Sequence, residues 1–106
     1  MGFFGFSRQP DINTGVAEYK NTEGAVLVDV RNIGEYAAGH IEGSINVPLQ
    51  FITDIKGRVT DLNTPLFVYC LSGGRSEQAA LLLKRIGYTN VKNIGGINSY
   101  TGRVVR

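Results

Sequence analysis

The sequence contains a single cysteine, Cys70, and the residues that follow it make this side chain a candidate nucleophile. They are Leu71, Ser72, Gly73, Gly74, Arg75 and Ser76. Two adjacent glycines let the backbone curl with positive φ, so that several N–H groups point at one place and form an anion-binding nest. Arg75 adds a permanent positive charge, and the helix expected after the loop adds the positive end of its dipole.

These features together favour the ionised form of the Cys70 thiol, which is the nucleophilic form. A free cysteine has a pKa near 8.5, so only about 3% is thiolate at pH 7. A pKa of about 6.5 would raise that fraction to roughly 75%. The hydroxyl groups of Ser72 and Ser76 are expected to donate hydrogen bonds to a bound sulfur, although Ser76 could equally serve only as a helix cap. The alternative for Cys70 is a buried, inert thiol, which its setting disfavours.

The composition limits the other kinds of site. The chain has 106 residues, a length that fits one domain, and its formal net charge of +2 is too weak to indicate nucleic acid or a membrane surface as a partner. One cysteine excludes an internal disulfide, and with a single histidine the chain does not supply the four ligands of a structural zinc site. We therefore expect no metal and no resident cofactor.

The N-terminal segment carries no targeting pattern. Its apolar stretch, Met1 to Phe6, is too short for a secretory signal and lacks a basic start. No run of residues approaches the length of a membrane span. We expect an N-terminal arm over residues 1–10, a domain over residues 11–106 and a cytoplasmic location, with a secretory signal trimmed from the chain left open.

Helical and strand patterns alternate along the domain. Helical patterns cover residues 11–21, with Asp11 as the cap, and residues 33–38, 49–55 and 76–86. Apolar, Val-rich or short extended runs predict strands over residues 25–30, 44–47, 66–69 and 91–94. This alternation predicts a small single α/β domain with a central, mostly parallel sheet and helices on both faces. Ligands bind beyond the carboxyl ends of the strands in such sheets, and Cys70 follows one of these ends.

Three motifs in the chain resemble those of the rhodanese (thiosulfate sulfurtransferase) homology family. The first runs from Leu27-Val28-Asp29-Val30-Arg31 through Glu35-Tyr36 to the segment 39–49 (GHIEGSINVPL). The second is the Cys70 loop, and the third is Asn93-Ile94-Gly95-Gly96. The resemblance covers residues 11–103. It implies the small α/β fold of that family and the transfer of a sulfane sulfur through a persulfide on the loop cysteine.

The resemblance assigns a role to each part of the loop. Cys70 would carry the persulfide, the backbone N–H groups of residues 71–75 would surround the sulfur, and Arg75 would attract a small anionic donor such as thiosulfate or polysulfide. The acceptor would be cyanide, a small thiol or a thioredoxin-like protein. Because the chain has no second cysteine, the sulfur must leave Cys70 for another molecule. The chain departs from the family at Leu71, where active thiosulfate enzymes often have a basic residue, and at Tyr100, where the family commonly has Trp.

Two other functions remain open for the same loop. A sulfur carrier or regulatory binding module would keep the fold with little turnover of its own. Protein tyrosine phosphatases and arsenate reductases also place a cysteine and an arginine on one loop, but with one residue more than the four that separate Cys70 from Arg75. The shorter loop suits a single sulfur atom better than a tetrahedral phosphate.

Supporting roles are expected for several residues outside the loop. Asp29 and Arg31 end the first buried strand, where Asp29 is expected to bind loop N–H groups and Arg31 to pair with Glu35. His40 is expected to make a structural hydrogen bond rather than to act as a base. Gly95-Gly96 is expected to let the chain pass close to the Cys70 loop.

Overall fold

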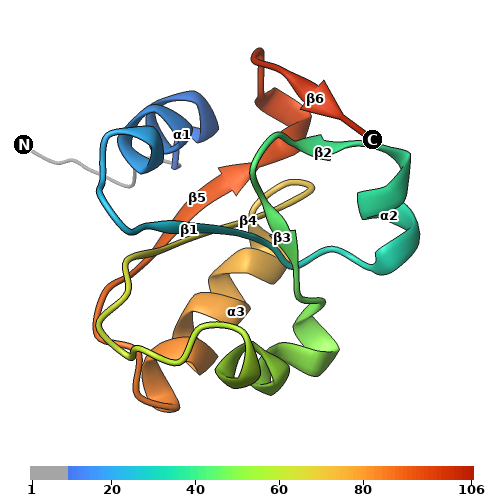
Figure 1. Ribbon diagram of the computed structural model, residues 1–106. Coiled ribbons are helices and arrows are strands. Elements are labelled where there is room, and N and C mark those ends of the chain that lie inside the picture. Colours follow the sequence, from blue (N-terminus) through green and yellow to red (C-terminus); the bar gives the residue numbers. More distant parts are fainter. Residues whose placement is uncertain (1–9) are drawn as a thin grey trace, which may run out of the picture.

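The computed structural model describes residues 10–106, so the prediction of an N-terminal arm falls almost entirely outside the described residues. Helices and strands alternate along the chain as the sequence pattern predicts (Figure 1). The elements are α1 (Ile12–Lys20), β1 (Val26–Asp29), α2 (Ile33–Ala38), β2 (His40–Ile41), β3 (Ile45–Asn46), the 3-10 helix η1 (Leu49–Gly57), β4 (Leu66–Cys70), α3 (Gly74–Arg85), β5 (Val91–Gly96), the 3-10 helix η2 (Ile97–Ser99) and β6 (Val104–Val105).

Four parallel strands form the central sheet in the order β3-β1-β4-β5. All five residues of β4 are buried, which explains why the segment reads as a continuous apolar run rather than an alternating one. The predicted α/β domain with a mostly parallel sheet is confirmed. Cys70 is the last residue of β4, at the carboxyl edge of the sheet.

The sheet separates two apolar clusters, one on each face. On one face, α1 packs Ile12 and Val16 against Leu27, Phe67 and Ile94. On the other face, α3 and η1 cover a larger cluster (Figure 1). Its buried members are Val28, Val30, Val47, Ile52, Ile55, Val59, Leu66, Val68, Cys70, Ala79, Leu83 and Tyr88. Burial of this apolar area on both faces holds the strand ends, and therefore the loops after them, in fixed positions.

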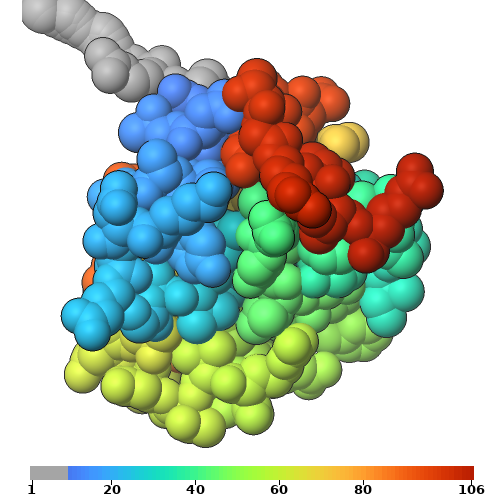
Figure 2. Space-filling view, turned by 45° about the horizontal axis from the view of Figure 1, so that its top comes forward, coloured from blue at the N-terminus to red at the C-terminus, as the bar shows by residue number. Residues whose placement is uncertain are grey.

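The structure also differs from the predicted elements in places. The second sheet, in which β2 pairs antiparallel with β6, was not predicted, because strands of two residues are too short to show a pattern. It fastens the C-terminal segment across the molecule between α1 and the region of β2 and α2 (Figure 2). Helix α3 begins at Gly74 rather than Ser76, and Gly73 rather than Ser76 is its N-cap residue. The predicted capping role of Ser76 is therefore wrong.

None of the helices within residues 10–106 combines the length and the apolar character needed to span a bilayer.

Candidate active site

The loop after β4 turns the chain from the sheet into α3 within three residues. Gly73 has φ +112, a conformation that L side chains rarely adopt, which explains the glycine at this position. Its carbonyl accepts from the Glu77 N–H at 3.1 Å, the first hydrogen bond of α3. The positive end of α3 therefore lies directly beside Cys70, where it favours a negative charge.

Hydrogen-bond donors surround the sulfur of Cys70. The Gly73 N–H donates to Cys70 Sγ at 2.9 Å, and the Ser76 hydroxyl lies 3.4 Å from the same atom. Burial by itself raises the pKa of the Cys70 thiol, but hydrogen bonds from the Ser76 hydroxyl and from the N–H groups of Ser76, Gly73 and Ser72 outweigh it. The net result is a pKa below the ordinary value of a thiol.

The loop residues named from the sequence are brought together, with different contacts. Ser72 and Gly73 approach the sulfur through their backbone N–H groups, and Ser76 through its N–H and its hydroxyl. Among the described residues, the Ser72 hydroxyl makes no hydrogen bond to this sulfur, so its expected role toward a bound sulfur stays a prediction. Leu71 has an exposed side chain, and its carbonyl accepts from the Asn98 N–H at 3.0 Å. Gly74 begins α3 and has open space where a Cβ would lie. The backbone N–H of Ser76 also donates to the sulfur, although the sequence predicted only the N–H groups of residues 71–75 there.

Gly95 and Gly96 pass directly beneath the loop, as the sequence predicted. A Cβ on Gly96 would lie 2.1 Å from the carbonyl oxygen of Leu71 and 2.5 Å from the Cα of Ser72, distances that no side chain can occupy. Gly95 has φ +104, and a register shift in the pairing of β4 with β5 immediately precedes it. The absence of side chains here lets β5 pack directly against the backbone of the cysteine loop.

Ser76 and Asn93 form a part-buried polar contact close to the sulfur of Cys70. Ser76 is fully buried in the first turn of α3, and its hydroxyl oxygen lies 2.7 Å from Asn93 Oδ1. Asn93 Oδ1 also accepts from the Gly95 N–H at 3.1 Å. Asn93 was not singled out from the sequence except as part of the motif that ends in Gly95-Gly96, because its role depends on where β5 lies beside α3.

The positive charge of Arg75 is paired with a carboxylate. Its two terminal nitrogens donate to the two carboxylate oxygens of Glu35 on α2, at 2.8 and 3.0 Å. The hydrogen bond from Arg75 lowers the pKa of Glu35 to about 2, and the same bond raises the pKa of Arg75. Both side chains are partly exposed, at 37% and 28%. Arg75 therefore stands at the site as one half of an ion pair rather than as an isolated charge.

Asp29 and Arg31 pair with each other, not with the partners expected. Asp29 accepts from the backbone N–H of Arg31 at 2.9 Å and from its guanidinium at 2.7 Å, and Arg31 also donates to the Gly39 carbonyl at 2.7 Å. The predicted Arg31–Glu35 pair is wrong. The backbone N–H that Asp29 binds belongs to Arg31 and not to the cysteine loop. This buried pair fixes the chain that leaves β1 and enters α2.

Two aromatic contacts complete the surroundings. His40 Nδ1 lies 2.9 Å from the Tyr36 carbonyl oxygen, and its ring stacks on that of Tyr36 with 3.7 Å between centroids, in agreement with a structural role. Tyr100 follows η2 and packs against the cluster under α1.

Beside Arg75, a hollow of about 290 Å³ is lined by Val30, Asn32, Pro48, Leu49, Gln50 and Arg75.

A family model described as a rhodanese-like domain matches residues 14–103. The chain belongs to the rhodanese-like domain family. The match begins within α1 and extends past the end of η2, so it includes the Cys70 loop and the strands beside it. The expectation drawn from the three sequence motifs is confirmed at the level of family and fold.

Individual rhodanese-like relatives agree with this membership. The thiosulfate sulfurtransferase PspE of Escherichia coli is 41% identical over 71 residues, which are 66% of this chain and 68% of that protein. A solved structure described as a rhodanese with anions from E. coli is 36% identical, has a TM-score of 0.72, and covers 77% of this chain and 98% of its own. The Bacillus subtilis protein YrkF, whose name proposes a sulfur carrier, is 33% identical over 99 residues, but the match covers only 52% of that protein.

Proposed function

We propose that this rhodanese-like protein is a sulfurtransferase that moves a sulfane sulfur from a small anionic donor to a thiophilic acceptor through a persulfide on Cys70. The observation that carries the proposal is the position of Cys70 Sγ, which accepts from the Gly73 N–H at 2.9 Å at the positive end of α3. Hydrogen bonds at this position lower the pKa of the thiol despite its burial.

In the first step the Cys70 thiolate attacks the outer sulfur of the donor. With thiosulfate, a bond forms between Cys70 Sγ and that sulfur, the sulfur–sulfur bond of the donor breaks, and sulfite leaves with the bonding electrons. The terminal sulfur of the persulfide keeps the negative charge that the thiolate brought. The N–H groups of the loop and the α3 dipole stabilise that charge, and no general base is needed because the attacking group is already deprotonated.

In the second step an external acceptor takes the terminal sulfur. Cyanide, a small thiolate or the thiolate of a thioredoxin-like protein attacks the outer sulfur, and Cys70 leaves as a thiolate ready for another turnover. The chain holds no second cysteine that could attack the persulfide from within. The acceptor is therefore a separate molecule, and the cycle uses no metal and no cofactor beyond the covalent persulfide.

A sulfur-carrier or regulatory role is the second candidate, and one contact favours it. Glu35 already occupies both terminal nitrogens of Arg75, which reduces the attraction of the site for a free anionic donor. A protein donor would depend less on that charge. The name of the relative YrkF points in the same direction. Phosphatase or arsenate reductase activity is disfavoured, because the loop has only four residues between Cys70 and Arg75.

Turnover assays with a sulfur donor and, separately, with a phosphate ester test the proposal. We expect the protein to form thiocyanate from thiosulfate and cyanide, Cys70→Ala to abolish this turnover without loss of fold, and neither protein to hydrolyse p-nitrophenyl phosphate. Turnover retained by Cys70→Ala would contradict the mechanism. Absence of turnover with a persulfide still formed on Cys70 would favour the carrier role, and phosphate release that depends on Cys70 would favour the phosphatase.

A further inference from the structure

The hydroxyl group of Ser76 lies within hydrogen-bond distance of more acceptors than it can donate to. It is fully buried, and because it carries one hydrogen it donates a single hydrogen bond at a time. Four acceptors surround its oxygen: Asn93 Oδ1 at 2.7 Å, the Gly73 carbonyl at 3.1 Å, Cys70 Sγ at 3.4 Å and the Gly95 carbonyl at 3.5 Å. The shortest contact is to Asn93, and the sulfur competes with it for the same proton.

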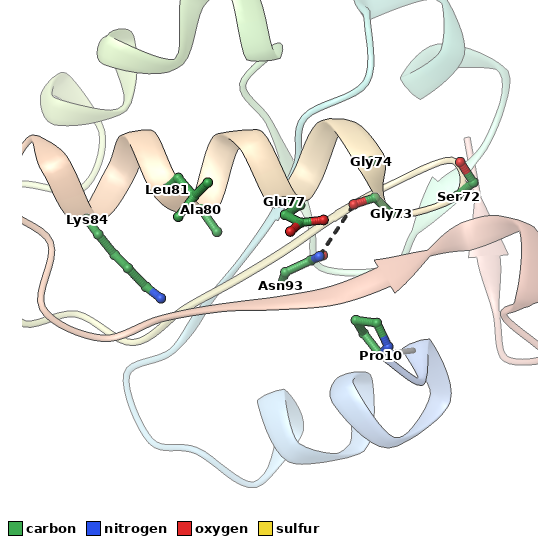
Figure 3. Close-up of a pocket in the computed structure, with 9 residues that line it drawn as sticks. All are labelled: Pro10, Ser72, Gly73, Gly74, Glu77, Ala80, Leu81, Lys84 and Asn93. Carbon is green, nitrogen blue, oxygen red and sulfur yellow. Dashed lines mark hydrogen bonds between the residues drawn. The ribbon is translucent and has the colours of Figure 1, made fainter. Parts of the chain in front are cut away.

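The amide of Asn93 is held with its oxygen toward Ser76. That oxygen accepts from the Gly95 N–H at 3.1 Å, and the amide nitrogen donates to the Gly73 carbonyl at 3.4 Å (Figure 3). Turning the amide over would place its NH₂ group against the Gly95 N–H, so this orientation is strongly preferred. Asn93 therefore presents a fixed acceptor to a hydroxyl that can rotate.

We propose that Asn93 is a positioning residue whose side-chain oxygen holds the Ser76 proton while the sulfur of Cys70 is neutral and yields that proton to the sulfur when it becomes anionic. A neutral thiol is a weak acceptor, so the amide oxygen wins the proton in that state. A thiolate or a persulfide anion accepts a charge-assisted hydrogen bond, which is about twice as strong as a neutral one. When the hydroxyl turns, Asn93 Oδ1 keeps its bond to the Gly95 N–H and is not left without a partner.

The proposal gives opposite signs to two substitutions. Ser76→Ala removes a donor from the anionic sulfur and raises the pKa of Cys70. Asn93→Ala removes the nearest competing acceptor and leaves the hydroxyl only the more distant Gly73 and Gly95 carbonyls, which destabilises the thiol form and lowers that pKa. A role of Asn93 in merely bracing the loop predicts the reverse, because a loosened loop would weaken the bond from the Gly73 N–H to the sulfur.

The charged groups around Cys70 do not change in these variants. Arg75 of α3 acts on the sulfur through its charge, and it is paired with Glu35 of α2. On the neighbouring strand β1, Asp29 is paired with Arg31. The segment of β5 that pairs with the end of β4 contributes Gly95 and Gly96. A shift in the pKa of Cys70 in the variants therefore reports on the hydroxyl and its acceptor.

The rate of alkylation by iodoacetamide as a function of pH measures the pKa of Cys70 directly, because the chain has no other cysteine. We expect Ser76→Ala to raise the pKa by about one unit and Asn93→Ala to lower it by about half a unit. In the Ser76→Ala background, Asn93→Ala should leave the pKa of Cys70 unchanged, because the hydroxyl for which Asn93 and the sulfur compete is then absent. Asn90→Ala, at an exposed position next to β5, serves as the matched control and should have no effect.

A rise or no change in the pKa with Asn93→Ala, or an equal fall in both backgrounds, would overturn the inference. If Asn93→Ala does not fold, Asn93→Asp replaces it. The new carboxylate raises the pKa of Cys70 in both backgrounds through its charge, and its stronger acceptor should add a further rise only where the Ser76 hydroxyl is present. Equal rises in the two backgrounds would overturn the inference. The proposal rests on the proposed function only in taking the Cys70 thiolate as the nucleophile. Alkylation needs no sulfur donor, so this test can fail while sulfur transfer stands, or succeed where transfer is absent.

Discussion

Glu35 and Arg75 form a two-point ion pair that joins α2 to the first turn of α3, with N–O distances of 2.8 and 3.0 Å. The pair fixes the guanidinium at the edge of the cysteine loop, in the planar arrangement that arginine makes with carboxylates. Because the Glu35 carboxylate balances the charge of Arg75, the guanidinium attracts an incoming anion less strongly than an unpaired arginine would.

Replacement of Arg75 by alanine should raise KM for thiosulfate while leaving most of kcat. Arg75 is partly exposed and already paired, so the expected change is modest, roughly two- to fivefold. Steady-state kinetics with thiosulfate as the varied donor measures it, and Arg103→Ala, at an exposed position outside the loop, is the control. An unchanged KM would mean that the donor is bound by the loop N–H groups alone.

The same pair makes stability depend on acid pH. The pKa of Glu35 is lowered from 4.5 to about 2 in the folded protein, so the carboxylate stabilises the fold fully above pH 4.5 and loses this effect as the pH falls toward 2. We expect Glu35→Gln to have a lower Tm than the wild type at pH 7, and the difference to shrink between pH 4.5 and pH 2. A constant difference in Tm over that range would show that the ionised pair does not stabilise the fold.

Gly96 should not tolerate even one added methyl group. In Gly96→Ala the new Cβ would overlap the backbone of Leu71 and Ser72, so the cysteine loop must move. A displacement of this size at a reacting group is expected to reduce activity on the order of 100-fold. Gly57→Ala is the matched control, because nothing lies within 4 Å of a Cβ at that position. Equal activity of the two variants would show that the loop does not depend on Gly96 for its position.

The sequence was sufficient to predict the parallel sheet and the position of Cys70. Two buried apolar runs, around Val28 and Val68, are separated by helical segments, and this pattern strongly favours a parallel α/β sheet. In such a sheet the residue at the end of the second run, Cys70, must lie at the carboxyl edge. These features depend on patterns several residues long, which a single sequence displays.

The pairing of individual charges could not be predicted in the same way. Arg31 and Glu35 have the spacing of neighbours on one helix, but α2 begins only at Ile33, so Arg31 lies outside it and folds back onto Asp29. Glu35 is then free to meet Arg75, forty positions along the chain. The contact between Asn93 and Ser76 likewise depends on how β5 and α3 pack together. Such contacts follow from tertiary arrangement, which local spacing does not encode.

The central claim is that Cys70 carries the transferred sulfur, and intact-mass spectrometry tests it most directly. After incubation with thiosulfate or polysulfide and removal of the excess, the protein should gain the mass of one sulfur atom. Cyanide or a small thiol should remove that sulfur, and Cys70→Ser should gain nothing under the same conditions. A wild-type protein that gains no sulfur from any donor, or a gain that persists in Cys70→Ser, would contradict the account.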